Sequence, residues 1–281
     1  MKFNRKLCIV VALLMLVSIA TAFGACGSEE EADNSLQEIQ DRGELILGCD
    51  DAFPPMGFDD NGEIVGFDID LARAVAEKLD VTLTVKPIDW GAKEMELSSG
   101  NIDAIWNGYT ITAERIEKVQ FTKPYLSNEQ LLTVKIDSEV QSKGDLAGKV
   151  LGVQIDSAAE ELVNADSEFL DSLDDLRIFD DYQAALNDLK ASDRLEAVAV
   201  DKILIEYVMT KAPDTFRTLD ESLGSEYFGI GLRQGSLTLA DAIDDALDEL
   251  KEDGTTAEIS ANWFGDDIVI RDVQRLTADD F

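Results

Sequence analysis

The sequence contains no histidine. That absence excludes Ser-His-Asp and Cys-His nucleophile pairs, histidine metal sites and histidine general bases. Basic residues are also scarce, with 24 lysines and arginines against 58 aspartates and glutamates and a formal net charge of −34. Nucleic-acid backbones and anionic membrane surfaces are bound by clustered cations, which such a chain does not offer. We therefore predict no nucleic-acid partner, and no docking on a membrane surface through charge.

The first 25 residues have the layout of a secretory signal peptide. Basic residues such as Lys2 and Arg5 precede an apolar run over residues 7–23, which is short for a membrane span, and small residues stand directly before Cys26. Cysteine in that place resembles the lipobox of bacterial lipoproteins, although Phe23 stands where leucine is usual. We expect cleavage before Cys26 and a lipid on Cys26 that holds the protein at the outer face of the bacterial cell membrane. The alternative is an ordinary signal peptide or an uncleaved anchor.

Residues 26–35 form an acidic segment that we interpret as a tether, because it is too polar to pack. Cysteine is rare in the whole chain, with Cys8, Cys26 and Cys49 as its three examples. Cleavage would remove Cys8 and lipid would modify Cys26, so Cys49 alone would stay free and no intramolecular disulfide could form. The body of the protein must therefore be stable through its core.

From residue 44 onward, short β-rich runs alternate with helical patterns. Helices are expected from about residues 157, 181 and 201, and an amphipathic helix over 237–250. Asn61-Gly62 between two short apolar runs is a strong hairpin signal. The alternation predicts parallel sheets with helices on both faces, an α/β fold. The predicted strands cover residues 45–49, 81–85, 103–106, 150–153, 176–179, 196–200 and 228–232.

Three local patterns bear on helix ends and on cofactors. Residues 157–160 and 255–258 match capping boxes, which mark helix starts. The acidic run over 241–249 matches no calcium loop and is interpreted as a solvated helix face. The glycines at 229, 231 and 235 have the wrong spacing for a dinucleotide fingerprint, and no Walker sequence occurs. We predict no metal site, no cofactor and no catalytic residues.

Polar residues gather at the ends of several predicted strands. In open α/β sheets, ligands bind beyond the carboxyl ends of the strands. Each such residue alone is ordinary, because polar residues commonly end strands and cap helices. Their joint placement, together with two aromatic residues in loops at the same edge, favours a cleft for a small polar ligand. These residues are Asp50, Asn107, Gly108, Thr110, Gln154, Ser157 and Asp201, with Phe53 and Trp90.

Several longer motifs resemble bacterial solute-binding proteins for polar amino acids, which serve ABC importers. The resemblance runs from about residue 36 to 265 in the right order, and it departs from the family at Asp156, where glycine is usual. The motifs that carry it are residues 48–58 (GCDDAFPPMGF), 66–72 (GFDIDLA), 107–115 (NGYTITAER), 121–125 (FTKPY), 200–201 (VD) and 262–265 (NWFG).

The resemblance implies a two-lobed periplasmic-binding-protein-like fold of type II. Each lobe would be a mostly parallel sheet flanked by helices, and two hinge strands would join them. Lobe 1 would comprise residues 36–125 and 226–281, and lobe 2 residues 126–225. A monomer that delivers its ligand to an ABC importer permease is expected, held at the membrane only through the lipid anchor.

The resemblance also implies roles for single residues. Arg115 would fork onto the ligand α-carboxylate, as guanidinium groups do, and Asp201 would take the α-ammonium. Phe53 and Trp90 would enclose the aliphatic stem, and Asp50 would face the side chain. Thr110 and the Gly108 backbone would complete the carboxylate pocket, and the remaining members of the expected ligand site are Asn107, Gln154, Ser157 and Ala158.

Simpler interpretations exist for three of these residues. Arg115 could form a surface ion pair with Glu114 or Glu117. Asp201 could be a plain N-cap, and Trp90 could belong to the core.

The expected mechanism is closure of the two lobes over a zwitterion. Closing a cleft over an unpaired charge is unfavourable, so closure should require both ends of the ligand to be paired. The expected ligand is an L-amino acid whose side chain donates hydrogen bonds, because Asp50 would repel an acidic side chain. Two other classes stay open: an enzyme on the same fold, such as a dehydratase for an amino-acid-like substrate, and a sensory or adhesion lipoprotein.

Overall fold

The structure, a computed structural model, describes residues 33–281. The predicted signal peptide over residues 1–25, the proposed lipid site Cys26 and most of the tether lie outside the described residues. Ser35, which we assigned to the tether, is instead the buried first residue of helix α2 (Ser35–Arg42) and hydrogen-bonds Thr238. No helix in residues 33–281 has the length and apolar character needed to cross a membrane.

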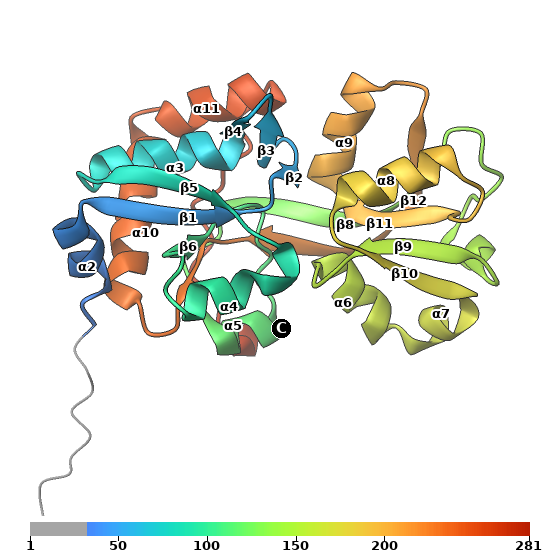
Figure 1. The fold of residues 1–281 in the computed structure, drawn as a ribbon, viewed down its shortest axis with the longest axis horizontal. Coiled ribbons are helices and arrows are strands. Elements are labelled where there is room, and N and C mark those ends of the chain that lie inside the picture. Colours follow the sequence, from blue (N-terminus) through green and yellow to red (C-terminus); the bar gives the residue numbers. More distant parts are fainter. Residues whose placement is uncertain (1–32) are drawn as a thin grey trace, which may run out of the picture. The chain divides into compact units, whose positions relative to one another are not determined.

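The first of two five-stranded sheets has the strand order β5-β1-β6-β13-β7 (Figure 1). Strand β1 pairs in parallel with β5 and β6, whereas β13 runs antiparallel to both β6 and β7. One strand therefore opposes the other four. The strands are β1 (Glu44–Cys49), β5 (Thr82–Pro87), β6 (Ala104–Ile105), β7 (Val119–Phe121) and β13 (Gly231–Arg233).

Helices cover both faces of the first sheet. Leu45 and Leu47 of β1 belong to one core with α3, α10 and α11, and Ile46 packs toward a second core with α4 on the opposite face. This alternation is the two-residue period of a strand. The helices are α3 (Phe67–Lys78), α4 (Lys93–Ser98), α5 (Ala113–Lys118), α10 (Leu237–Glu252) and α11 (Thr255–Phe264), with the short 3₁₀ helices η1 (Trp90–Ala92) and η3 (Ala278–Asp280).

The second sheet has the order β10-β9-β11-β8-β12. Here β9, β10 and β11 are parallel, and β8 runs antiparallel to its neighbours β11 and β12. The prediction of mostly parallel sheets flanked by helices is thus confirmed, with one reversed strand in each sheet. The elements are β8 (Leu126–Lys135), β9 (Val150–Gln154), β10 (Asp175–Phe179), β11 (Ala197–Asp201), β12 (Phe216–Phe228), α6 (Ala158–Ala165), α7 (Ser167–Ser172), α8 (Tyr182–Ala191), α9 (Lys202–Lys211) and η2 (Lys143–Leu146).

The chain passes between the two sheets at two adjacent places. It leaves the first sheet after Phe121 and enters β8, and it returns from β12 at Phe228 to β13. The ends of the two long strands pair where Leu126 lies opposite Phe228. The periodicity of the sequence indicated neither β8 nor β12, and it placed one strand over 228–232 where β12 ends and β13 begins.

Local signals in the sequence have mixed outcomes. The hairpin at Asn61-Gly62 is confirmed: it joins β3 (Gly57–Asp60) to β4 (Glu63–Val65) in a three-stranded sheet with β2 (Ala52–Phe53). Both turn residues have positive φ, 59° and 94°, as a type I′ turn requires. The Ser157 hydroxyl does cap α6 by accepting from Glu160 N, but the Glu160 carboxylate accepts from Asp156 N rather than from the cap residue.

Of two interpretations of the C-terminal helices, one is wrong and the other holds only in part. The expected capping box at Thr255 is absent, because Gly254 occupies the cap position with φ 88° and Asp253 accepts hydrogen bonds from Thr255. The acidic run over 241–249 is not wholly solvated, since Asp244 is buried and pairs with Arg271 and Arg275. These arginines come from the C-terminal segment, which fastens onto α10.

Candidate functional site

A small cavity of about 10 Å³ lies where residues from both sheets meet. A cavity of this size holds about one water molecule. Nine of the eleven residues predicted for the ligand site line it, and Asp50 and Asn107 do not. The lining consists of Phe53, Trp90, Gly108, Thr110, Arg115, Gln154, Ser157, Ala158, Tyr182 and Asp201.

Arg115 lies at the start of α5, where the Thr112 hydroxyl caps the helix by accepting from Arg115 N at 3.3 Å. The residue is 2% exposed, and its guanidinium donates to the Thr110 carbonyl at 3.1 Å and to the Asp156 carbonyl at 2.8 Å. It also pairs with Glu161 at 2.8 Å. The two hydrogen bonds use two of the five guanidinium N–H donors.

The partners of Arg115 decide between its two interpretations. The ion pair with Glu114 or Glu117 that the sequence left open is not formed, and Glu114 pairs with Lys118 instead. Asp156 and Glu161 follow β9 of the second sheet, so Arg115 connects elements of both sheets. Asp156 has φ 51°, which fits a position where the similar family has glycine.

Asp201 ends β11 and precedes α9. It stands at the N-cap position, but its side chain makes no capping hydrogen bond. Its Oδ1 atom accepts instead from the side-chain amides of Asn128 and Gln130, both at 2.8 Å. Burial, and after it the negative charge of Glu226, hold the pKa of Asp201 well above its ordinary value. The carboxylate is thus turned toward the interior and not toward the helix.

Asp50 and Asn107 do not line the cavity but lie next to residues that do, Gln154 and Gly108 respectively. Asp50 N donates to Asn107 Oδ1 at 3.1 Å, and the Asp50 carboxylate accepts from Ala52 N at 2.8 Å. The other carboxylate oxygen accepts from Gln154 Nε2 at 2.6 Å, which links the two sheets. Burial raises the pKa of Asp50 to about 6. The Asp50 carboxylate therefore reaches Gln154, a residue of the cavity lining, and not the cavity itself.

The aromatic residues form two walls. The Phe53 ring lies 5.9 Å from the Tyr182 ring of the second sheet's α8, and the Trp90 ring packs edge-on against Tyr109 at 5.8 Å. Trp90 belongs to a core cluster and also lines the cavity, so both of its interpretations apply. Sequence reasoning missed Tyr182, which follows the capping residue Asp181 after β10.

Gly108 is held by a residue that the predictions did not include. Its N–H donates to the carboxylate of Asp68 at 2.7 Å, and Asp68 also accepts from the Tyr125 hydroxyl at 2.8 Å. Asp68 is fully buried, and burial raises its pKa to about 7. The only signal for Asp68 was its place in the motif over residues 66–72.

Lys93 is a second missed residue. It is 2% exposed, and its Nζ donates to the carbonyls of Trp90 at 3.2 Å and Asp156 at 3.1 Å. Burial lowers the pKa of Lys93 to about 8. Lys93 and Arg115 therefore donate to the same carbonyl, that of Asp156 in the turn after β9.

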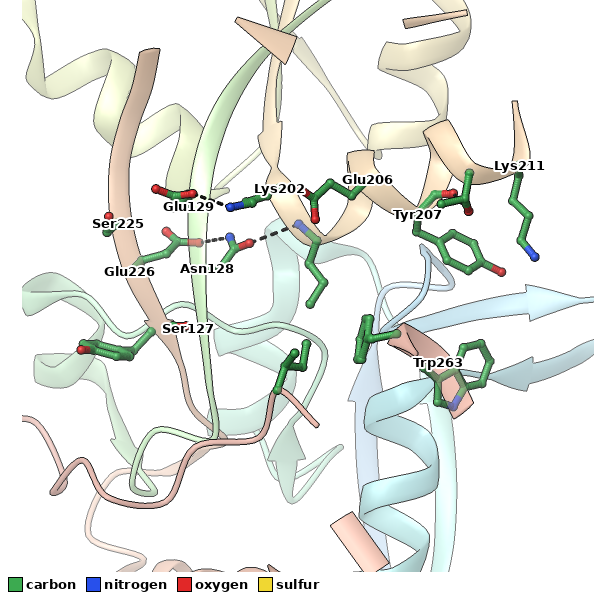
Figure 2. Close-up of a pocket in the computed structure, with 15 residues that line it drawn as sticks. Ser127, Asn128, Glu129, Lys202, Glu206, Tyr207, Lys211, Ser225, Glu226 and Trp263 are labelled. Atoms are coloured by element: carbon green, nitrogen blue, oxygen red, sulfur yellow. Dashed lines mark hydrogen bonds and ion pairs between the residues drawn. The ribbon is translucent and has the colours of Figure 1, made fainter. Parts of the chain in front are cut away.

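A much larger groove of about 780 Å³ lies beside β8, β12 and α9 (Figure 2). None of the predicted site residues lines it. Lys202 pairs there with Glu129 at 2.8 Å, and both side chains are about 40% exposed. The lining also includes Asn128, Ile203, Glu206, Tyr207, Lys211, Glu226, Trp263 and Phe264.

The chain thus has two mixed β-sheets flanked by helices and joined by two chain crossings. Residues from both sheets meet around buried charged groups, which is the arrangement of a two-lobed ligand-binding protein. Residues 45–266 match the family model of bacterial extracellular solute-binding proteins, family 3, and the chain belongs to that family. The relatives that it matches are binding proteins and not enzymes.

Individual relatives match over nearly their whole length. The chain is 30% identical to the L-cystine-binding protein TcyJ of Escherichia coli over 92% of this chain and 96% of the relative. It is also 30% identical to the arginine-binding extracellular protein ArtP of Bacillus subtilis, over 90% and 96% respectively. A substrate-binding protein of an ABC uptake transporter from Streptococcus pneumoniae, solved with bound histidine, matches with a TM-score of 0.81 and 37% identity over 85% of this chain and 98% of that one.

Proposed function

We propose that this chain is the substrate-binding component of an ABC uptake transporter and binds one L-amino acid between its two lobes. The observation that carries the proposal is the joint burial of Arg115 and Asp201 at one cavity. Arg115 comes from the first sheet's helices and Asp201 from the second sheet, so an α-carboxylate and an α-ammonium would be held from opposite sides. The relatives that bind cystine, arginine and histidine support this assignment.

Binding must begin with an open cleft, because a cavity of about 10 Å³ cannot admit an amino acid. The ligand carboxylate would displace Glu161 and the Asp156 carbonyl from Arg115 or use its remaining donors. The lobes, taken as residues 36–125 with 226–281 and residues 126–225, would move about β8 and β12. Closure over the paired zwitterion would then be a population shift driven by the ligand.

The proposed ligand class is an amino acid whose side chain carries N–H donors, either basic or polar. Asp50 has Asp51 and Asp181 as charged neighbours, so an acidic side chain would meet like charge. A donor of the ligand would take the place of Gln154 at Asp50. The ligands named for the three relatives all carry nitrogen beyond the α-carbon.

A thermal-shift screen of the full chain against the common L-amino acids and cystine tests this function. A ligand that binds only the folded state raises the melting temperature. We expect arginine, glutamine, histidine or cystine to raise the melting temperature more than glutamate, aspartate or leucine does. If no amino acid shifts the melting temperature, the proposed function is wrong. If glutamate or leucine gives the largest rise in melting temperature, only the role of Asp50 is wrong.

We further propose that lipid on Cys26 anchors the protein, with the acidic segment over residues 27–34 as spacer. Cys26→Ala should abolish membrane attachment and leave amino-acid binding unchanged. Detergent-phase partitioning of wild type and variant measures the attachment. Retention of Cys26→Ala in the membrane fraction after signal removal would contradict the anchor.

A further inference from the structure

Two carboxylates from neighbouring strands share the same pair of amide donors. Asp201 of β11 and Glu226 of β12 flank β8, where Asp201 lies opposite Gln130 and Glu226 opposite Asn128. Asn128 Nδ2 donates to Asp201 Oδ1 at 2.8 Å and to Glu226 Oε1 at 2.6 Å. Gln130 Nε2 donates to the same two oxygens, each at 2.8 Å. The two oxygens are therefore close neighbours, and Figure 2 shows Asn128 and Glu226 pointing toward each other.

The surroundings of this pair supply hydrogen bonds but little positive charge. The amides of Asn128 and Gln130 are neutral, as are the hydroxyls of Thr110 near Glu226 and of Tyr182 near Asp201.

Two cations lie in the neighbourhood of the pair. Arg115 acts on Glu226 through its charge, but its guanidinium is bound to Asp156 and Glu161. Lys202 directly follows Asp201, yet its Nζ pairs with Glu129. Burial raises the pKa of both carboxyls.

Two adjacent carboxylates in such a place favour one shared proton, because both cannot ionise without a cation. We propose that Glu226 is the second carboxylate of the ammonium site, and that the Asp201–Glu226 pair exchanges one proton for the ammonium of the bound amino acid. This inference rests on the proposed function and deepens it. In the free protein the pair holds one proton. The ligand's ammonium brings a positive charge beside Asp201, the proton leaves to solvent, and no other bond forms or breaks.

The geometry also provides a separate route for that proton. Asp201 lines the small ligand cavity, whereas Glu226 lines the large groove. The proton can therefore leave through the groove while the ligand fills the cavity. Because binding releases a proton, the affinity should rise with pH over the range in which the free pair is protonated and the bound pair is not.

Calorimetry of the full chain with L-arginine and L-glutamine, in phosphate and in Tris buffer at one pH, measures the number of protons released. We expect the wild type to release about one proton per ligand near neutral pH. Glu226→Gln keeps the size of the side chain and removes the acid, and its release should fall to near zero. Glu206→Gln, an exposed residue of the same groove, is the matched control and should release as many protons as wild type.

The outcomes separate this inference from the function beneath it. Binding without proton release, or equal release by wild type and Glu226→Gln, overturns the exchange and leaves amino-acid binding intact. A carboxyl carbon NMR titration of the ligand-free wild type decides the matter if Glu226→Gln does not fold or neither amino acid binds. If Asp201 and Glu226 both titrate in the ordinary range, the shared proton is overturned. A coupled titration of Asp201 and Glu226 at raised pKa supports it.

Discussion

The small cavity and the large groove differ in a way that volume does not capture. The groove is the roomier by far, at about 780 Å³ against about 10 Å³. Its charged side chains other than Glu226, however, are half-exposed or exposed, whereas Arg115, Asp201 and Gln154 of the cavity are each at most 4% exposed. Buried polar groups lose hydration and must be satisfied by specific partners. A ligand site in this protein is therefore better recognised by the convergence of buried charge than by empty space.

The largest expected effect concerns Asp68, the buried carboxyl that holds Gly108 of the cavity lining. Asp68 has a folded pKa of about 7 against an ordinary value of 3.8, so the folded state holds its proton longer than the unfolded state. A raised acid pKa favours the folded protein at low pH, and this advantage is lost as pH rises through about 4 to 7. Relative to wild type, Asp68→Asn should thus become more stable with rising pH, by a few kcal/mol, on the order of 1.4 kcal/mol per pKa unit.

Urea unfolding of Asp68→Asn and wild type across this pH range checks the expectation. Asparagine can present one oxygen to both Gly108 N and the Tyr125 hydroxyl, so the hydrogen bonds survive. Glu206→Gln, at an exposed position of the groove, serves as control. Parallel curves of unfolding free energy against pH for Asp68→Asn and wild type would show that the pKa of Asp68 is not raised in the folded protein.

The second effect concerns the cation of the cavity. Arg115→Lys keeps the charge but loses the planar fork, and one lost charge-assisted hydrogen bond is worth roughly 1.5–3 kcal/mol. Amino-acid binding should weaken at least about tenfold, as measured by calorimetry. Lys211→Gln removes a cation from the groove lining instead and should change the affinity less than about twofold. Equal losses for the two variants would erase the distinction between cavity and groove.

The third effect concerns the backbone of the cavity wall. Gly108 has φ 58°, and a β-carbon there would lie 2.8 Å from a Phe53 ring carbon. Gly148 has φ 70° with no atom within 4 Å of such a carbon. Gly148→Ala should cost only the backbone strain of about 1–2 kcal/mol. Gly108→Ala should cost about 1–3 kcal/mol more through overpacking. Chemical unfolding of both variants measures the difference, which vanishes if Phe53 can move aside.

The smallest effect belongs to the groove. Glu129 and Lys202 form a half-exposed ion pair, and such pairs contribute about 0–1 kcal/mol. Glu129→Gln should therefore change the free energy of unfolding by less than about 1 kcal/mol. A larger change in denaturant unfolding would mean that the groove is held as tightly as the cavity wall.

The sequence predicted the parallel part of both sheets because strands such as β1 and β11 are continuous apolar runs. It missed β8 and β12 for identifiable reasons. On β8, Asn128 and Gln130 are polar yet point inward, which breaks the alternation expected of a half-buried strand. On β12, an edge strand with register irregularities, few residues are buried. Apolar periodicity cannot signal a strand whose inward positions are built for hydrogen bonding.

The candidate site shows the same limit. Residues at strand ends, such as Gln154 and Asp201, could be predicted because the strand ends could. Glu226 and Asp68 could not, since Glu226 lies within a strand that gave no signal and Asp68 acts through Gly108 from inside a helix. Asp50 was assigned to the cavity, but its carboxylate is taken up by Ala52 N and Gln154. Such pairing depends on side-chain distances that one sequence does not contain.

The carbonyl of Asp156, which accepts from both Lys93 and Arg115, has a consequence for how this protein can evolve. The acceptor belongs to the main chain, so no side-chain substitution at position 156 removes it. Selection acts on this contact only through the backbone angle, and aspartate is among the residues that adopt positive φ most readily after glycine. Glycine, asparagine or aspartate at position 156 would therefore all keep this acceptor, although aspartate alone adds an ion pair with Lys93 at 4.0 Å.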